Sequence, residues 1–193
     1  MKLAIKLHGT SGAGKSTVVR ELMRDDPNPT LYGDPKRPDA YCIKWPNFKH
    51  PLYVLGPYTN TCGGLDAIGK FDRHIELFNE YAPLGHLIYE GMPQSGFYGR
   101  IGEASEVYGE NHIFAFMDTP IDTCIDRVAQ RRKEKGNLTP LDPKNTVLKD
   151  KAMWRLKERL EKGLGIPVRQ TVLLKYELAP ETLLNLFKEY DAR

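Results

Sequence analysis

The feature of this sequence that most constrains the fold is a short glycine-rich loop at residues 9–17. It reads Gly-Thr-Ser-Gly-Ala-Gly-Lys-Ser-Thr and satisfies every fixed position of the pattern G-x-x-x-x-G-K-[ST]. Apolar residues alternate along residues 2–7 before the loop, as in a buried strand, and residues 16–23 after it have helical character. The pattern therefore predicts a strand, a tight loop and a helix in direct succession.

The chemistry of this loop is that of an anion site. Its glycines permit positive φ, so that backbone N–H groups and the N-terminus of the following helix face a bound anion. In this pattern the lysine reaches the β and γ phosphates of a nucleotide, and the serine hydroxyl holds Mg²⁺. A chance glycine turn is the alternative, and the agreement of strand, loop and helix disfavours it. We expect a nucleoside triphosphate to be bound by Gly9, Thr10, Ser11, Gly12, Ala13, Gly14, Lys15, Ser16 and Thr17.

Composition indicates one globular unit. The chain has 193 residues, of which 40% are hydrophobic and 27% charged, enough for a single core and a single domain over residues 1–193. No apolar run approaches the ~20 residues of a membrane span, and no signal peptide is expected. Its three cysteines form neither a metal pattern nor a disulfide framework. We expect a cytoplasmic protein without a membrane partner; the sequence leaves its oligomeric state open.

The rest of the chain alternates segments of strand and helix character. Strands are expected at residues 2–7, 30–32, 86–91, 112–117 and 170–175, with a hairpin at 41–45 and 51–55. Helices are expected at residues 16–23, 65–82, 97–108, 121–133, 149–164 and 180–190. This alternation predicts a three-layer α/β fold, in which helices cover both faces of a mainly parallel five-stranded sheet that carries a small β-hairpin insertion.

Three carboxylates follow predicted strands or open a predicted helix, where ligands of such sheets bind. Glu90 ends an apolar strand and suits a contact to Mg²⁺, and the alternative is a surface or capping residue. Asp34 is a candidate general base for an attacking hydroxyl, although Gly-Asp-Pro is also an ordinary turn. Asp66 follows two glycines and either orients an acceptor or caps a helix. We expect the loop at residues 58–64 to recognise substrate.

Basic residues gather in the second half of the chain. Arg127 and Arg131 share a helix face, where they would clamp transferring phosphates or simply form a solvated surface. Residues 127–162 hold twelve Lys and Arg against five Asp and Glu, which suits either a polyphosphate or a nucleic-acid backbone. A lid is expected at about residues 127–150, because the polar loop at 136–145 contains two prolines.

With these motifs the chain resembles the small P-loop kinases of nucleosides, nucleotides and polynucleotides. The resemblance rests on residues 9–17, on Ile-Tyr-Glu-Gly at 88–91 and on Met-Asp-Thr-Pro at 117–120 leading to Arg127 and Arg131. It implies the kinase fold, ATP and Mg²⁺, and arginines that contact ATP. The block Gly-x-Tyr-x-x-x-Cys-Gly-Gly-x-Asp at 56–66 is similar, more narrowly, to phage kinases of 5-hydroxymethyluracil in DNA. That similarity implies DNA with a modified pyrimidine as partner, the base being flipped out of the duplex.

The resemblance leads to an ATP- and Mg²⁺-dependent phosphotransferase acting on a hydroxyl of a nucleic-acid component. Lys15 would bind the phosphates, and Ser16 and Glu90 would bind Mg²⁺. Asp34 or Asp66 would orient the acceptor hydroxyl. Arg127 and Arg131 would neutralise the charge that develops on the transferring group. A kinase of free nucleosides or deoxynucleoside monophosphates is an alternative, although residues 91–94 lack the arginine that follows Gly-x-Pro in adenylate-kinase-like enzymes. An NTP-hydrolysing switch or motor subunit is another; the chain lacks the guanine motif Asn-Lys-x-Asp and an evident second domain.

Overall fold

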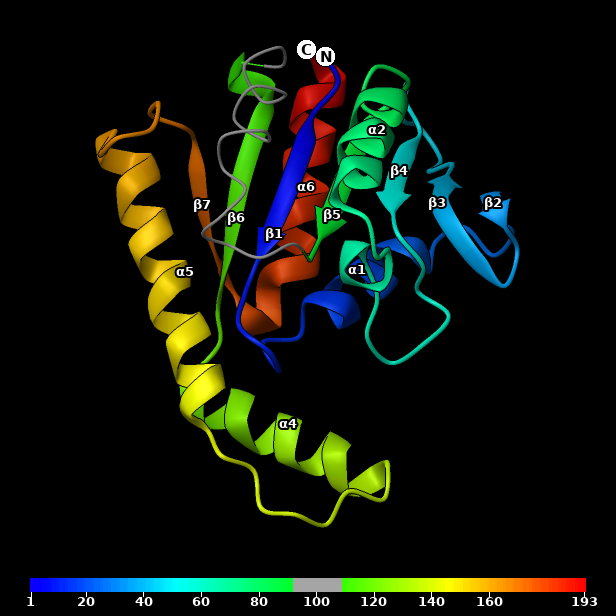
Figure 1. Cartoon of the computed structure of the whole chain (residues 1–193). Coiled ribbons are helices and arrows are strands. Elements are labelled where there is room, and N and C mark those ends of the chain that lie inside the picture. Colours follow the sequence, from blue (N-terminus) through cyan, green and yellow to red (C-terminus); the bar gives the residue numbers. More distant parts are fainter. Residues whose placement is uncertain (92–108) are drawn as a thin grey trace.

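The computed structural model describes residues 1–91 and 109–193 and is built around one twisted sheet (Figure 1). The helix expected at residues 97–108 lies outside the described residues. The sheet contains seven strands in the order β2-β3-β4-β5-β1-β6-β7. Their bounds are β1 Ala4–His8, β2 Thr30–Asp34, β3 Arg37–Ile43, β4 Leu52–Leu55, β5 His86–Glu90, β6 His112–Asp118 and β7 Thr171–Lys175.

The expectation of a five-stranded sheet with a separate hairpin was wrong. Five neighbouring strands, β4-β5-β1-β6-β7, do run parallel. The hairpin strand β4 is itself one of these five, because Leu52 to Val54 pair in parallel with β5. Strands β3 and β2 then extend the same sheet in antiparallel fashion. Edge strand β2 reaches Asp34 through a register shift at Gly33, whose φ of 86° suits a bulge.

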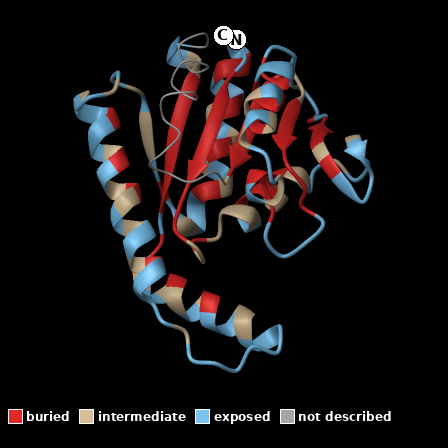
Figure 2. Ribbon diagram, in the orientation of Figure 1, coloured by how far each residue is buried: buried red, intermediate tan, exposed pale blue. Residues whose placement is uncertain are grey.

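Helices cover both faces of the sheet, which confirms the three-layer arrangement. Helices α1 (Lys15–Met23) and α6 (Ala179–Ala192) pack on one face, against the alternate β1 residues Leu3, Ile5 and Leu7. Helix α2 (Phe71–Tyr81) and helix α5 (Lys144–Lys162) pack on the other. The central strands are buried on both faces, as near-continuous apolar sequences require (Figure 2).

Helix α4 (Ile121–Glu134) lies beyond the carboxyl ends of the parallel strands and runs into α5 through the loop at residues 135–143 (Figure 1). Short 3₁₀ turns occur at Leu65–Ala67 (η1), Gly109–Asn111 (η2) and Tyr176–Leu178 (η3). None of the helices among the described residues combines the length and apolar character that crossing a bilayer requires.

Two predicted helix boundaries differ from the structure. The helix expected at 65–82 is divided into η1 and α2, because Ile68 and Lys70 adopt extended backbone angles on either side of Gly69. The helix expected from residue 149 begins at Lys144, whose N–H donates to Asp142 Oδ1 over 3.0 Å. It ends at Gly163, which takes the left-handed conformation common after helices.

Candidate active site

One large pocket opens where the parallel strands end, and its volume is about 670 Å³. The glycine-rich loop and the start of α1 form its floor, while the 61–67 segment and one face of α4 form its walls. Its lining includes most of the residues that the sequence singled out: Ser11, Gly12, Gly14, Lys15, Ser16, Thr17, Asp66, Glu90, Arg127 and Arg131.

The glycine-rich loop is held in place by close packing. Gly12 and Gly14 have φ values of 86° and 93°, which L side chains rarely adopt. A Cβ atom at Gly12 would lie 2.2 Å from the Cys124 carbonyl oxygen, and one at Gly14 would lie 2.6 Å from the Tyr176 ring. The sequence therefore needs glycine at these positions to pass between α4 and η3.

Two buried hydroxyls tie the same loop to its neighbours. Thr10 Oγ1 donates to the Thr146 carbonyl in the first turn of α5 over 2.9 Å. Thr119 Oγ1, just after β6, donates to the Ala13 carbonyl over 2.8 Å. These bonds fix the loop between β6 and α5, so its N–H groups keep a defined orientation.

Lys15 and Ser16 open helix α1 and extend along the pocket floor. The Lys15 ammonium donates to the loop's own carbonyls, at 2.8 Å to Gly9 and 3.3 Å to Thr10. The Ser16 hydroxyl accepts from the Gly63 N–H over 3.2 Å. Both polar groups therefore line the pocket, where an anionic ligand can accept hydrogen bonds from them.

Glu90, the last residue of β5, presents a carboxylate on the pocket wall although only 2% of the residue is exposed. Burial raises its pKa, against the opposing effects of the Lys15 charge and the neighbouring hydroxyls of Ser16 and Tyr58. Its Oε1 has no hydrogen-bond partner among the residues that the structure describes. Such an atom is costly to bury without a ligand.

The oxygen atoms of Ser16 and Glu90 form a donor set suited to a hard cation. No group of three or more His, Cys, Asp and Glu side chains that could hold a metal occurs in the described parts of the chain. Mg²⁺ at nucleotide sites uses one or two protein oxygens together with phosphates and waters rather than a full protein cage. The residues present therefore fit this ion.

The 56–66 segment packs closely on the end of β5. A Cβ atom at Gly64 would lie 2.5 Å from Glu90 Cγ, and one at Gly91 would lie 2.6 Å from the Asp66 nitrogen. At Gly63 it would lie 2.3 Å from the Tyr58 ring. The room that these glycines leave is thus filled by the chain itself, although Gly63 also lines the pocket.

Most polar groups of the 58–61 segment serve the loop rather than the pocket. Arg20 of α1 donates to the Asn60 carbonyl, and the Tyr58 N–H donates to the Tyr41 hydroxyl over 3.0 Å. Of the residues from Tyr58 to Thr61, only Thr61 lines the pocket. Within the 58–61 segment, Thr61 is therefore the residue placed to contact a ligand in the pocket.

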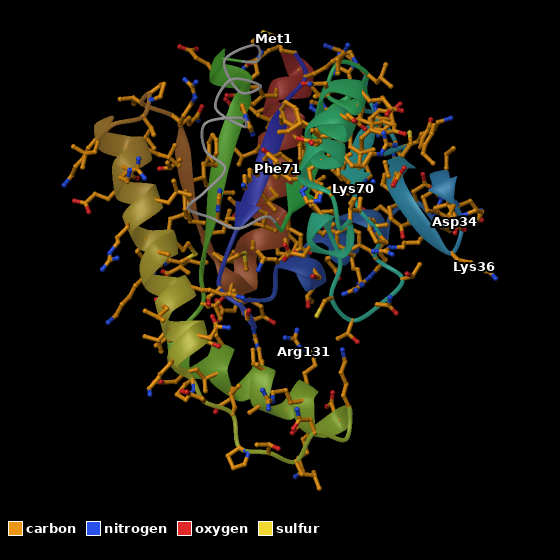
Figure 3. The ribbon with its side chains drawn as sticks, viewed as in Figure 1. Met1, Asp34, Lys36, Lys70, Phe71 and Arg131 are labelled. Atoms are coloured by element: carbon orange, nitrogen blue, oxygen red, sulfur yellow. The ribbon has the colours of Figure 1, made fainter. Side chains whose placement is uncertain are left out.

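The structure separates the two candidate bases. Asp66 is the second residue of η1 and lines the pocket. Its charge favours the charged form of buried Lys6, whose pKa burial lowers to about 8. Asp34 is exposed at the β2–β3 turn, where its Oδ1 accepts the Lys36 N–H over 2.9 Å. Asp34 and Arg131 lie well apart in Figure 3. Asp34 does not line the pocket, because β2 is the outermost strand of the sheet, beyond β3 and β4, and its carboxylate serves the turn there.

Helix α4 presents a polar face to the pocket. Arg127 donates to the Gly12 carbonyl over 3.3 Å, and its guanidinium lies 4.1 Å from the centre of the Tyr176 ring. Arg131 donates to Cys62 Sγ over 3.1 Å, which connects α4 with the 56–66 segment. Asp126, Gln130 and Glu134 complete this face at helical spacing.

Tyr176 lines the pocket but has no role in the sequence-based expectations, and the contact of Cys62 with Arg131 was not among them either. Tyr176 follows β7 directly, so the rule that selected Glu90, a polar residue just after a parallel strand, also finds it. Cys62 gives no such signal, because its contact with Arg131 depends on how the 56–66 segment folds back over α1.

Comparisons with known proteins add the decisive observation. No family model matches the chain. It is 36% identical to the 5-hmdU DNA kinase of Pseudomonas phage PaMx11, over 85% of this chain and 87% of that protein. The chain belongs to the 5-hmdU DNA kinase family. Identity is 27% to the 5-hmdU DNA kinase of Pseudomonas phage M6, over 80% of this chain and 83% of that protein. The chain is 30% identical to the 5-hmdU DNA kinase of Delftia phage PhiW-14, over 75% of this chain and 59% of that protein.

Membership in the 5-hmdU DNA kinase family does not rest on the glycine-rich loop alone. Each of the three alignments covers at least three quarters of this chain. The similarity therefore extends through the sheet and its helices as well as the nine residues of the loop.

Proposed function

We propose that this chain is a kinase that transfers the γ-phosphoryl group of ATP to the 5-hydroxymethyl group of 5-hydroxymethyluracil in DNA. The observation that carries the proposal is the pocket itself, in a chain of the 5-hmdU DNA kinase family. A phosphate-binding type of loop, a buried carboxylate with an unpartnered oxygen and two arginines of α4 converge there. Phosphoryl transfer needs chiefly this positioning and charge.

The glycine-rich loop acts as a P-loop that binds the triphosphate. Its N–H groups face the anion, and Lys15 exchanges the carbonyls of Gly9 and Thr10 for phosphate oxygens. Arg127 and Arg131 approach the same space from α4, and neutralise charge that develops on the transferring group. Arg127 and Tyr176, already stacked, form the wall against which the donor nucleotide rests.

Ser16 and Glu90 would hold Mg²⁺, and the ion would screen the phosphate charges when bound. Burial suits this role for Glu90, because an unpartnered carboxylate oxygen in a dry site gains most from a cation. Lys15 lies close enough to favour the charged carboxylate.

Asp66 orients the acceptor hydroxyl and takes its proton. As the acceptor oxygen bonds to the γ phosphorus, the bond from that phosphorus to the β–γ bridging oxygen breaks, and ADP leaves with the bridging oxygen. Lys6 is buried, and the charge of Asp66 favours the charged form of this lysine. Of the two candidate bases, only Asp66 lines the pocket.

A panel of acceptors tests the proposal. Labelled ATP is supplied with hydroxymethyluracil DNA, unmodified DNA, free hydroxymethyldeoxyuridine or deoxynucleoside monophosphates. We expect Mg²⁺-dependent transfer to the modified DNA and none to unmodified DNA. Transfer to free nucleotides alone would make the chain a nucleotide kinase. Release of inorganic phosphate alone would make it an NTP-hydrolysing protein, and either result contradicts the proposal.

A further inference from the structure

The first half of α5 carries four exposed cations that no acidic side chain neutralises. They are Lys144, Lys149, Lys151 and Arg155, named here the basic strip. None of their side chains forms an ion pair or hydrogen bond with any residue in the described ranges 1–91 and 109–193. The strip is therefore a source of positive potential that is not compensated locally.

The second half of the same helix is different. Lys157 pairs with Glu161 at 2.5 Å, and Lys162 pairs with Glu158 at 2.7 Å. The acidic residue within the first half, Asp150, is half-buried, and burial raises its pKa. The first half of α5 therefore carries positive charge that its own carboxylates do not compensate, unlike the second half.

The strip also has a direction. Three of the four, Lys144, Lys151 and Arg155, are separated by seven and four residues, so they lie along one line of the helix; Lys149 lies on another side of it. Eleven residues extend about 17 Å along a helix, which equals about five steps of a duplex at ~3.4 Å each. Met153, Leu156 and Leu160 pack on the sheet, so the line faces solvent on the outer side of α5 (Figures 1 and 2).

The end of α5 at which the strip begins is hydrogen-bonded to the glycine-rich loop. Lys144 opens α5, and the Thr146 carbonyl, two residues on, accepts the hydrogen bond from Thr10 of the glycine-rich loop. A polyanion that follows the strip is thus led to the place where the triphosphate binds.

We infer that the basic strip binds the sugar–phosphate backbone of the DNA substrate beside the pocket. This inference rests on the proposed function, which supplies a DNA substrate, and adds the surface that holds it. Contacts of this kind position a duplex without reading its sequence, so binding extends to unmodified DNA, while the pocket selects the modified base.

The test compares two charge-matched variants. The strip variant carries Lys144→Gln, Lys149→Gln, Lys151→Gln and Arg155→Gln. The control variant removes four exposed cations beside α1 and α6, with Arg24→Gln, Lys44→Gln, Lys188→Gln and Arg193→Gln. Both carry the same net charge, and surface changes of this kind alter the free energy of unfolding little. Circular dichroism and affinity for ATP verify that each variant is folded.

Affinity for a duplex is measured between 50 and 200 mM salt. The logarithm of the affinity falls linearly with the logarithm of the salt concentration, and each phosphate contact adds about 0.9 to the steepness of this fall. The steepness should therefore be smaller by about 3 to 4 in the strip variant. We expect its kcat/KM on hydroxymethyluracil DNA to fall at least about tenfold, with ATP affinity unchanged. The control variant keeps the wild-type slope.

Two results would overturn the inference: a wild-type slope in the strip variant, or equal losses in the two variants. The second result would mean that only net charge matters. If the strip variant alone loses its slope while the wild-type protein fails to phosphorylate modified DNA, the proposed function fails and the DNA-binding surface stands.

Discussion

Glu90 and Asp66, the two carboxylates of the pocket, have different surroundings. Glu90 is almost completely buried, and burial raises its pKa; Asp66 lies within a 3₁₀ turn, and its charge acts on a buried lysine. A cation compensates the first environment, and a proton-accepting role suits the second. Each assignment can be tested by replacing the carboxylate with the amide of the same shape.

Replacing Asp66→Asn removes the proposed base but retains its shape. We expect the rate of phosphoryl transfer to fall by about 10² or more, because general base catalysis typically contributes 10²–10⁴. Affinity for ATP is unchanged, as measured by equilibrium titration. The matched control is Asp34→Asn at the distant β2–β3 turn, which keeps wild-type activity. If the Asp66 variant remains active, its carboxylate only caps η1.

Replacing Glu90→Gln tests the metal site. The amide is a poorer ligand for Mg²⁺ than a carboxylate, so the Mg²⁺ concentration for half-maximal transfer should rise at least about tenfold. Glu134→Gln, on the pocket face of α4, is the control and leaves this concentration unchanged. An unaltered Mg²⁺ requirement in the Glu90 variant would remove this residue from the metal site.

At the scale of elements, the 56–66 segment is the part of the site that depends most on glycine. Gly64 has a φ of 85° and touches Glu90, so its backbone sets where the buried carboxylate lies. Only glycine adopts this positive φ without strain, and only glycine leaves room for the Glu90 side chain, because it has no Cβ.

A Gly64→Ala substitution should lower the free energy of unfolding by about 1–3 kcal/mol, because the new methyl group combines a strained φ with a 2.5 Å approach to Glu90 Cγ. Urea unfolding measures the loss. Gly69→Ala is the control, since a Cβ there has nothing within 4 Å and no positive φ opposes it. Equal stability of the two variants would show that the packing at Gly64 is not constrained.

Sequence periodicity predicted the elements well where the apolar residues recur at the spacing of a strand or a helix. Strand β1, helix α1 and the apolar faces of α2 and α5 follow from alternation and helical spacing. The break at Gly69 did not follow, because Leu65, Ile68 and Phe71 keep helical spacing although the chain between them is extended. Tertiary contacts of the 56–66 segment with β5 decide the backbone there, and spacing alone does not contain them.

At the scale of the molecule, His8 and His112 are fully buried histidines whose pKa values are strongly lowered. His8 stacks on Phe116, and His112 accepts or donates at the Tyr89 hydroxyl over 3.0 Å. Burial, together with the charge of Lys6, lowers the pKa of His8 well below its usual value and that of His112 to about 3. Both side chains bind protons in the unfolded chain at a pH where the folded protein does not.

The free energy of unfolding should therefore decrease as the pH is lowered. Because the folded pKa values are depressed, their contribution is present above about pH 6.5 and is lost as the pH drops below it. Between pH 7.5 and 5.5 each histidine accounts for about 1.4 kcal/mol, or about 3 kcal/mol together. Urea unfolding at the two pH values measures this, and a His50→Gln variant should show the same loss. Equal free energies at both pH values would contradict neutral burial.

The whole sheet and the whole site were only partly accessible from the sequence. Rules for strand ends located Glu90 and Asp66 together with the glycine-rich loop, because parallel strands bring their carboxyl ends to one edge. The same rule also selected Asp34, since it does not reveal that β2 is the outermost strand, separated from β5 by β3 and β4. Exposed β2 has no buried face, so its full length gave no periodic signal.

Phosphoryl transfer to a base within DNA is the central claim, and product analysis tests it most directly. Hydroxymethyluracil DNA is incubated with ATP, Mg²⁺ and the protein, then digested to nucleosides and examined by mass spectrometry. We predict deoxyuridine carrying a phosphate on its 5-hydroxymethyl group, present with the wild-type protein and lost with Asp66→Asn. A digest in which the phosphate resides only on strand ends, or only in free nucleotides or inorganic phosphate, would contradict the account.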